Sequence, residues 1–409
     1  MKKALALAAL SVAAPVAMAQ SVQVYGVLDA GLSRVTGLRG GTQNSLVSGI
    51  MDGSRLGFKA SEDLGGGYRA LFTLEHRLEV DTGGISNRPG SGSQVPDRIA
   101  RAELLGLFPA LQPAVTGVAN NLGSTAGVNL DGRFWDRQIF LGLVTPVGAV
   151  LAGRQYTPGY EVAATFDTLE TQSSLSAGQV GSFPPTVDIR ISNAVAYRAV
   201  VGPVSAALMY GLKEGSASTG RFIGGNVIYK TDAFSVGAGY NTRENELGQK
   251  SLTTALVGAS VAIGPGTLVG QAAAIQDDNP TGLSTIAATL TPLTGAATAL
   301  VVQNAFVNAI KQDSRLYHVG YRLPIGPHKF YVAYSYLDDR RGADADTASY
   351  GAVYSYSFSK RTDLNVALTH FNNKNLAQAA PGQAGMLGGV TASAGKDANA
   401  LAIGIRHRF

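Results

Sequence analysis

The stretch LAIGIRHRF, residues 401–409, carries the pattern that decides the fold. Its odd-numbered positions hold Leu, Ile, Ile, His and Phe, and its even-numbered positions hold Ala, Gly, Arg and Arg. Side chains of a β-strand alternate between two faces, so this stretch has one largely apolar face and one small or charged face. A strand with lipid on one side and water on the other has this pattern, and Phe409 falls where an aromatic girdle is expected.

The same period of two recurs along the chain, for example in residues 54–60, 331–337 and 364–370. Residues 331–337 hold three Tyr and one Val, residue types that favour strands. Alternation alone does not identify a membrane barrel, because antiparallel sheets of soluble proteins alternate too. The spacing of the turns separates the two classes of protein.

Short turn signals alternate with longer irregular stretches. The short signals lie near residues 63–67, 145–148, 201–203, 230–232, 264–266, 324–327 and 359–361, and the longer stretches cover 36–51, 81–131, 157–186, 214–220, 244–249, 277–311, 339–346 and 374–395. Outer-membrane barrels have short periplasmic turns and long external loops. About sixteen strands fit between these connections, and closure leaves no unpaired edge in lipid. The sequence therefore predicts an all-β, closed, transmembrane antiparallel barrel.

The first residues have the three parts of an export signal. Lys2 and Lys3 form a basic start, residues 4–14 are apolar, and residues 17–19 read Ala-Met-Ala. The apolar run is too short to cross a bilayer as a helix. We expect residues 1–19 to be a cleaved signal peptide and residues 20–409 to form one barrel domain in the outer membrane.

Composition argues against several other classes of protein. The chain has no Cys, which excludes a disulfide framework, a thiolate metal site and a Cys nucleophile. The net charge is +5, or +3 once Lys2 and Lys3 are removed, and there is no basic run, so we expect no nucleic-acid partner.

Signals for catalysis and metal binding are also missing from the sequence. The five His residues show no metal-ligand spacing, and no nucleophile elbow or phosphate loop is present. We therefore expect no cofactor, no metal and no enzymatic activity. The acidic stretch 338–346 leaves one alternative open, a divalent-cation site in place of a charged external loop.

Several segments in order resemble one family. Residues 20–31, 54–67, 136–143 and 153–158, together with the terminal Phe409, are similar to motifs of Gram-negative general porins of the β-proteobacterial type. The resemblance implies a homotrimer of sixteen-stranded barrels in outer-membrane lipid. It also implies that the third external loop folds into the lumen, where acidic residues face a row of arginines and sort solutes by charge.

The resemblance assigns candidate site residues by position. The constriction wall would hold Arg55, Arg137, Arg190 and Lys59, and the inward loop after Tyr156 would hold Asp167, Glu170 and Glu161, with Asp167 the best placed. Residues 169–174 lack the Pro-Glu-Phe-Gly-Gly segment that many family members have in this loop. The wall arginines and the positive net charge predict a mild preference for anions.

The period of two leaves the direction of Arg137 open. Arg137 shares parity with Ile139, Leu141 and Leu143. If Arg137 points into the lumen, three apolar side chains follow it there and need the inward loop to cover them. The alternative is that Arg137 points outward near a rim or a subunit boundary.

Two long stretches depart from simple loops. Residues 99–107 have apolar residues at helical spacing, which predicts a helix. The resemblance implies that this loop contacts a neighbouring subunit. Residues 279–310 lack any charged residue but contain two prolines and several polar residues, so they predict a long, partly helical loop that packs on a neighbouring subunit.

The function that these observations favour is passive diffusion of small hydrophilic solutes and ions through a water-filled pore. Three alternatives remain: a substrate-specific outer-membrane channel, a barrel enzyme such as an outer-membrane lipase, and an adhesin-like or soluble all-β binding protein. Only the last alternative predicts extraction without detergent.

Overall fold

The computed structural model of the chain describes residues 21–86, 95–125, 132–170, 173–181, 183–213, 220–382 and 388–409. The predicted signal peptide, residues 1–19, lies outside them. The strands are β1 Ser21–Leu38, β2 Gly41–Ser48, β3 Arg55–Gly65, β4 Tyr68–Arg77, β5 Gln138–Thr145, β6 Gly148–Tyr156, β7 Arg190–Val201, β8 Val204–Gly211, β9 Phe222–Lys230, β10 Phe234–Glu244, β11 Lys250–Ile263, β12 Gly266–Asp277, β13 Gln312–Ile325, β14 His328–Asp339, β15 Thr347–Ser357, β16 Thr362–Asn373 and β17 Ala398–Arg408.

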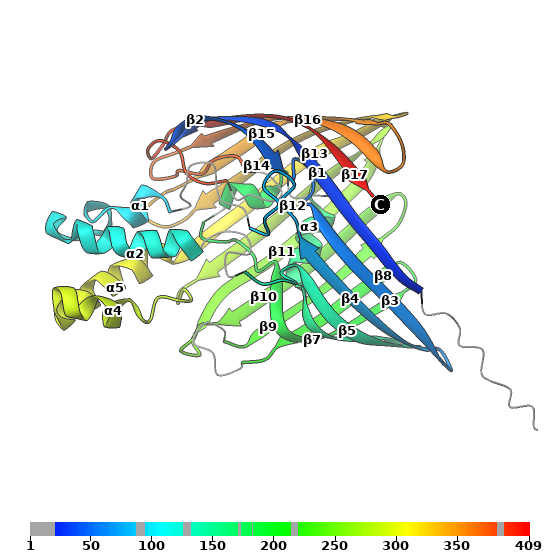
Figure 1. Cartoon of the computed structure of the whole chain (residues 1–409), viewed down its shortest axis with the longest axis horizontal. Helices are drawn as coiled ribbons and strands as arrows, with labels where there is room; N and C mark the ends of the chain where they lie inside the picture. Colours follow the sequence, from blue (N-terminus) through cyan, green and yellow to red (C-terminus); the bar gives the residue numbers. More distant parts are fainter. Residues whose placement is uncertain are drawn as a thin grey trace, which may run out of the picture.

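These strands form one closed antiparallel barrel (Figure 1). Each strand from β3 onward pairs with the next one, and β1 pairs with β17 from Val27 opposite Arg408 to Thr36 opposite Asn399. The described residues contain 17 strands, of which β2 and β3 pair one after the other with β1 and share a single position. Sixteen positions result, so the predicted fold is confirmed.

The gap between β2 and β3 is a short inward excursion of residues 49–54. The Asp29 carboxylate on β1 holds it by accepting hydrogen bonds from the backbone N–H groups of Ile50, Met51 and Asp52, at 3.0, 2.9 and 2.8 Å. Ile50 and Met51 are fully buried. The excursion therefore places Asp52 and Arg55 on the lumen side of the wall.

The last strand shows which face meets lipid. Leu401, Ile403 and Ile405 are 46%, 45% and 53% exposed on the outer surface, whereas Ala402 and Arg406 on the other face are buried. The two faces of residues 401–409 are those that the alternation predicts. The apolar side chains lie on the outside of the barrel because the solvent there is hydrocarbon.

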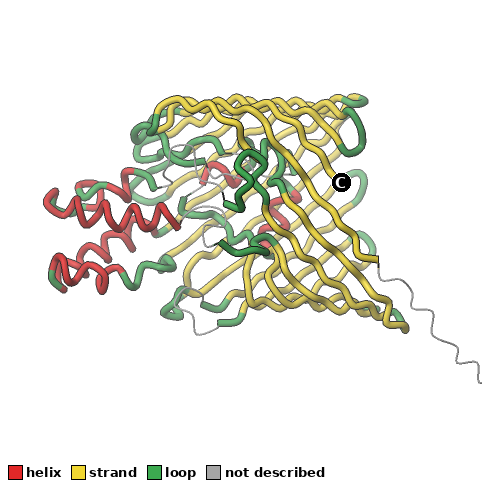
Figure 2. Tube along the Cα trace, viewed as in Figure 1, coloured by secondary structure: helices red, strands yellow, loops and turns green. Residues whose placement is uncertain are grey.

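Helices occupy two places, inside the barrel and beyond one rim (Figure 2). The helix α3, Pro158–Thr165, lies in the lumen, and the single-turn helix η3, Ala177–Gly181, follows it in the same loop. The other helical segments are α1 Asp97–Ala100, η1 Glu103–Leu105, η2 Pro109–Leu111, α2 Gln112–Thr125, α4 Ile286–Thr294 and α5 Ala296–Ile310. They lie beyond the rim that carries the long loops. In the described part of the chain, no helix combines the length and the apolar character needed to cross a bilayer.

Candidate functional site

Glu75 on β4 lies at the centre of a cluster of cations on the inner wall. One carboxylate oxygen accepts a hydrogen bond from Nε of Arg137 at 2.7 Å. The other accepts from the hydroxyl of Tyr25 at 3.1 Å and lies 3.5 Å from Nε of Arg55. Glu75 is 5% exposed, so its charge is stabilised by these partners rather than by bulk water.

A second centre is the hydroxyl of Tyr156 at the end of β6. It accepts hydrogen bonds from Arg137 at 2.9 Å and from Arg190 at 2.8 Å. The guanidinium of Arg190 also lies over the Tyr156 ring, with its carbon 4.4 Å from the ring centre. One phenol oxygen thus accepts hydrogen bonds from two arginines and holds them close together.

Lys59 extends this group along β3. Its Nζ lies 4.4 Å from the centre of the Tyr25 ring, on the lumen face that it shares with Gly57 and Arg55. Gly57 leaves the space that the Tyr25 ring occupies, because a Cβ there would lie 2.2 Å from a ring carbon. The structure therefore brings all four predicted wall cations onto one face.

The wall continues across the barrel closure through Asp52. Its carboxylate lies 3.6 Å from Arg55 and 2.8 Å from Arg406 on β17. Asp363 at the start of β16 pairs with the same Arg406 at 3.1 Å and with Arg408 at 2.9 Å. Asp52 and Asp363 therefore connect Arg55 with Arg406 and Arg408, which lie at the other end of the sequence.

We call these connected side chains the basic wall. It consists of six cations, Arg55, Lys59, Arg137, Arg190, Arg406 and Arg408, and three carboxylates, Asp52, Glu75 and Asp363. Even with Asp29 counted as a fourth negative charge, positive charge is in excess on this part of the lumen. Anions are attracted to such a surface, and cations are repelled.

The direction of Arg137 differs from both sequence alternatives. Strand β5 begins at Gln138, so Arg137 precedes it and the alternation does not extend to Arg137. Ile139 and Leu141 are exposed on the lipid face, while Arg137 is 4% exposed and points inward. Asp136 supports this geometry, since its carboxylate accepts hydrogen bonds from the backbone N–H and Nε of Arg77 at 2.9 and 3.2 Å.

The loop between β6 and β7 folds into the lumen, as predicted. Thr157 caps α3 by accepting a hydrogen bond from the Tyr160 N–H at 3.2 Å. Phe166 packs on the inner face of β11, where a Cβ at Gly258 would lie 2.3 Å from the ring. Glycine on the wall therefore makes room for the loop.

Two acidic residues of this loop pair with arginines on barrel strands outside the basic wall. Glu161 pairs with Arg198 on β7 and accepts a hydrogen bond from the Asn226 amide at 3.0 Å. Glu170 pairs with Arg322 on β13. Their charges are therefore balanced by neighbouring guanidinium groups.

The expectation that Asp167 offers its charge to the lumen is wrong. Asp167 is 4% exposed, and its carboxylate accepts hydrogen bonds from the backbone N–H groups of Leu169 and Ala177, both at 3.0 Å, and from the Ser176 hydroxyl at 3.3 Å. This carboxylate closes a turn of the loop on itself. The physical reason is that a loop buried inside a barrel must satisfy its own backbone donors.

The acidic stretch 338–346 uses its carboxylates in the same way. Asp339 accepts hydrogen bonds from Arg341, and Asp346 accepts them from the Tyr336 hydroxyl and from the Asp339 N–H at 2.9 Å. Across the described ranges, no three His, Cys, Asp or Glu side chains group in a way that suits a metal ion. The charged-loop interpretation accounts for this stretch.

Several site residues were missed at the level of sequence. Glu75 could have been found, because it shares the period-two face of β4 with Arg77 and Thr73. Tyr156, Asp52 and Asp363 gave no such signal, since their roles depend on which strand ends meet in the closed barrel.

Comparison with known proteins gives one family. The model of the Gram-negative porin family matches residues 6–376. The chain is 25% identical to outer membrane porin protein 32 of Delftia acidovorans over the full length of both chains. It is 41% identical to major outer membrane protein P.IB of Neisseria meningitidis over 86 residues, which are 20% of this chain and 25% of that protein.

Solved structures share the fold. An anion-selective porin from Comamonas acidovorans superposes with a TM-score of 0.67 at 20% identity, covering 96% of this chain and all of that one. The trimer form of OmpT from Vibrio cholerae superposes with a TM-score of 0.59 at 15% identity, covering 96% and 100%. At these identities the likeness concerns the fold alone.

Proposed function

Since the chain belongs to the Gram-negative porin family, we propose that its barrel is a channel in the outer membrane through which small hydrophilic solutes and ions diffuse passively. The resemblance seen in residues 20–31, 54–67 and 136–143 is thereby confirmed. Family membership also indicates a channel rather than an enzyme. Passive diffusion needs no cofactor, because the lumen only has to be wet and wide enough.

The observation that carries the ion preference is the basic wall. Its cations outnumber its carboxylates, and an anion that passes it exchanges part of its hydration for attraction to arginine side chains. Glu75 sits between Arg55 and Arg137 and weakens that attraction. We therefore propose a mild preference for anions, as the name of the Comamonas acidovorans porin states for that protein.

In this proposal the inward loop narrows the lumen. The charges of Glu161 and Glu170 are balanced by Arg198 and Arg322. The Asp167 carboxylate accepts hydrogen bonds from the backbone of its own loop. The loop therefore narrows the lumen without placing a strong row of free carboxylates opposite the basic wall. The transverse field comes mainly from one side of the pore, from Arg55, Arg137, Arg190 and Lys59.

We also propose a homotrimer. Neighbours of the same fold include the trimer form of OmpT. The outer face of β5 exposes Leu141, at 66%, and the segment before β5 exposes Phe134, at 63%. Apolar and aromatic side chains of this kind suit a contact with a second copy or with lipid. Cross-linking that gives trimers in detergent supports this part of the proposal, and a monomer alone contradicts it.

Phe409 has an assembly role in the proposal. Its N–H donates to the Gly26 carbonyl at 3.2 Å, and its carbonyl accepts from the Gly26 N–H at 3.1 Å. The ring lies over Gly26, where a Cβ would clash at 2.4 Å. Phe409 thus extends the ladder of hydrogen bonds that closes the barrel.

We also propose that residues 1–19 are cleaved during export. The mass of the purified protein tests this cleavage.

Liposome swelling tests diffusion directly. For a diffusion channel, the uptake rate falls smoothly with the size of neutral sugars and rises in proportion to their concentration. Saturation by one sugar would favour the substrate-specific alternative. Phospholipid hydrolysis by the purified protein would favour the barrel enzyme, and absence of any swelling would contradict both kinds of channel.

A further inference from the structure

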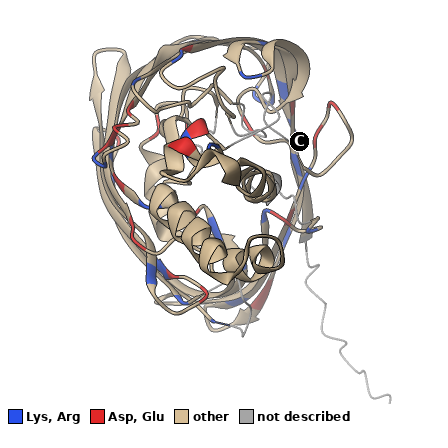
Figure 3. Ribbon diagram, turned by 90° about the vertical axis from the view of Figure 1, so that its left-hand side faces the viewer, with Lys and Arg blue, Asp and Glu red and all other residues tan. Residues whose placement is uncertain are grey.

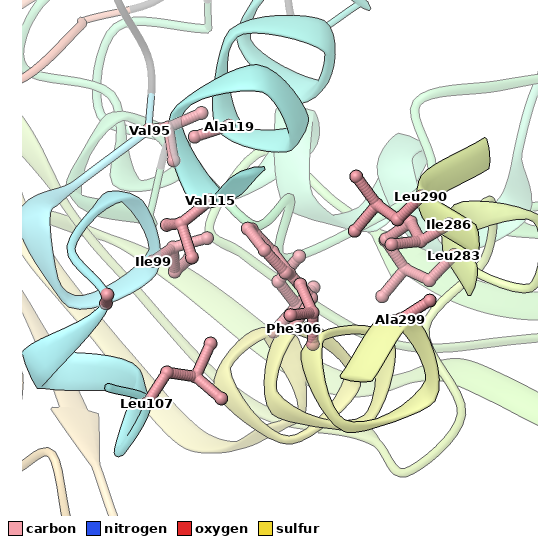
Figure 4. Close-up of a cluster of buried hydrophobic side chains, with 13 residues drawn as sticks. Val95, Ile99, Leu107, Val115, Ala119, Leu283, Ile286, Leu290, Ala299 and Phe306 are labelled. Carbon is pink, nitrogen blue, oxygen red and sulfur yellow. The ribbon is translucent and has the colours of Figure 1, made fainter. Parts of the chain in front are cut away.

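The two longest external connections of the chain build one compact unit. Helices α1, α2, α4 and α5 pack around a common apolar core beyond the rim of the barrel (Figures 1 and 4). Val115 of α2 and Val302 and Phe306 of α5 are fully buried in it. The apolar residues of 99–125 are thus covered by residues 283–310 of the same chain, so this core is buried without a neighbouring subunit. We call this unit the helical cap.

Polar contacts fasten the cap to the barrel rim. Arg39 at the β1–β2 turn pairs with Asp97 of α1 at 2.6 Å. Arg98 and Arg341 both donate to the Ala309 carbonyl near the end of α5, at 2.9 and 3.3 Å. A guanidinium at a helix C-terminus satisfies a carbonyl and suits the helix dipole.

The other end of the long connection is fastened as well. The Glu246 carboxylate in the β10–β11 loop accepts hydrogen bonds from the N–H groups of Gly282 and Ser284, at 2.9 and 3.2 Å. Both ends of the segment that carries α4 and α5 are therefore fixed to the rim. Together with the buried core, these contacts make the cap a preorganised body rather than a loose loop.

The cap also rests on the inward loop. Phe183 of that loop packs against the core of the cap. The Gln312 amide, directly after α5, donates to the Pro185 carbonyl at 3.0 Å. The Thr254 hydroxyl on β11 donates to the neighbouring Thr186 carbonyl at 2.6 Å. The returning part of the inward loop is thus held between the barrel wall and the cap.

The cap lies across the mouth of the barrel and has little charge. Seen along the barrel, the helices lie in front of the lumen within the ring of strands (Figure 3). Helices α2, α4 and α5 contain no Asp, Glu, Lys, Arg or His. The charged residues of the cap, Asp97, Arg98, Arg101 and Glu103, sum to zero net charge, so the cap adds no net charge at the mouth. The field of the basic wall is screened within about 8 Å at physiological salt.

From this arrangement we propose that the helical cap is a neutral sieve at the external mouth, in series with the basic wall. It selects solutes by size before they reach the charges that select by sign. The inference rests on the proposed function, because a sieve has meaning only for a diffusion channel. It assigns a specificity role to residues 97–125 and 283–310, outside the basic wall and the inward loop.

One-sided exclusion of neutral polymers tests the sieve. Polyethylene glycols of graded size are added to one side of single channels in a planar bilayer, and a polymer that enters the pore lowers its conductance. In the wild type, we expect the largest polymer that enters the pore from the cap side to be smaller than the largest one that enters from the opposite side. The cap side is identified with Phe108→Cys, the only cysteine in that variant, through biotin and streptavidin.

Two variants and a matched control separate the sieve from general damage. Phe306→Ala opens the cap core, and replacement of residues 279–310 by a short Gly/Ser linker removes α4 and α5. Both should raise the cap-side size limit several-fold in polymer mass towards that of the opposite side, with an unchanged ion preference. Phe108→Ala, at a cap position that is 81% exposed, should leave both limits as in the wild type.

Equal size limits from both sides of the wild type would overturn the sieve. So would an unchanged cap-side limit in the linker variant, or in Phe306→Ala if the linker variant does not fold. Heat-modifiable mobility on gels shows whether each barrel is folded. A wild type without any conductance steps would contradict the proposed function, and the sieve with it.

Discussion

The basic wall and the helical cap follow one another along the same channel, and they differ in chemistry. The wall is polar, and Glu75 and Arg137 are almost completely buried with their charges paired. The cap holds together through apolar contacts around Phe306, and three of its helices contain no charged residue. This difference in chemistry places selection by charge in the basic wall and selection by size in the helical cap. Variants of one part should therefore leave the other kind of selection unchanged.

The largest effect is expected from breaking the buried ion pair of the wall. Arg137→Ala leaves Glu75 without its closest cation, and loss of one partner of a buried pair costs about 3–5 kcal/mol. The free energy of unfolding from urea titration of the refolded barrel measures this loss. Arg137→Ala/Glu75→Ala should regain part of it, because no buried charge is left unpaired.

Arg221→Ala is the control for this prediction. Arg221 pairs with Glu244 at an exposed position, where water screens the pair, so its removal should change the free energy of unfolding far less than Arg137→Ala does. Equal losses for Arg137→Ala and Arg221→Ala would mean that the pair in the wall has no special role in stability.

The cap should respond to removal of apolar volume instead of charge. Phe306→Ala should cost about 3–5 kcal/mol of packing within the cap, since the ring is fully buried. The barrel itself should keep its unfolding midpoint. Limited proteolysis of the external loops in detergent measures the effect, with faster cleavage expected in Phe306→Ala and wild-type rates in Phe108→Ala. Cleavage at the wild-type rate in Phe306→Ala would show that the core does not hold the cap.

Glu75→Gln should sharpen the selection by charge. The variant removes a negative charge that lies between Arg55 and Arg137 and keeps a hydrogen-bonding side chain of similar shape. The anion-to-cation permeability ratio should rise several-fold, while the size limit for neutral polymers stays the same. A ratio that falls or does not change would show that Glu75 does not weaken the wall.

The smallest effect is a dependence of stability and anion preference on pH, through Glu79, which pairs with Arg77 at 3.2 Å. Burial raises the pKa of Glu79 to about 7, and the nearby Arg77 offsets only part of that rise. The folded state holds this proton more tightly than the unfolded state, so the contribution to stability is present at low pH and is lost as the pH rises through about 7. Protonation also removes a negative charge, so anion preference should rise slightly from pH 8 to pH 6. Glu79→Gln should remove this dependence, and an unchanged profile would assign it to another group.

The sequence predicts features that depend on neighbouring residues better than features that depend on residues far apart in the chain. Alternation and turn spacing are local, so they predicted the barrel, its sixteen positions and the faces of residues 401–409. The resemblance brought together Arg55, Arg137 and Arg190, which the structure gathers around Glu75 and Tyr156. The rule of alternation failed at Arg137 because the strand begins one residue later.

Contacts between distant loops were beyond sequence reasoning. Apolar residues at helical spacing in 99–107 indicate that a face is buried, but not what covers it. The structure supplies α5 of the same chain as the partner. The direction of the Asp167 side chain could not be predicted for a similar reason. A carboxylate that accepts hydrogen bonds from its own loop looks the same in the sequence as one that faces water.

The zero-current potential of single channels across a potassium chloride gradient tests the central claim most directly. The basic wall predicts anion preference in the wild type, a loss of most of it in Arg55→Ala/Arg190→Ala, and no change in Arg221→Ala. Cation preference in the wild type, or the same potential in Arg55→Ala/Arg190→Ala as in the wild type, would contradict the account.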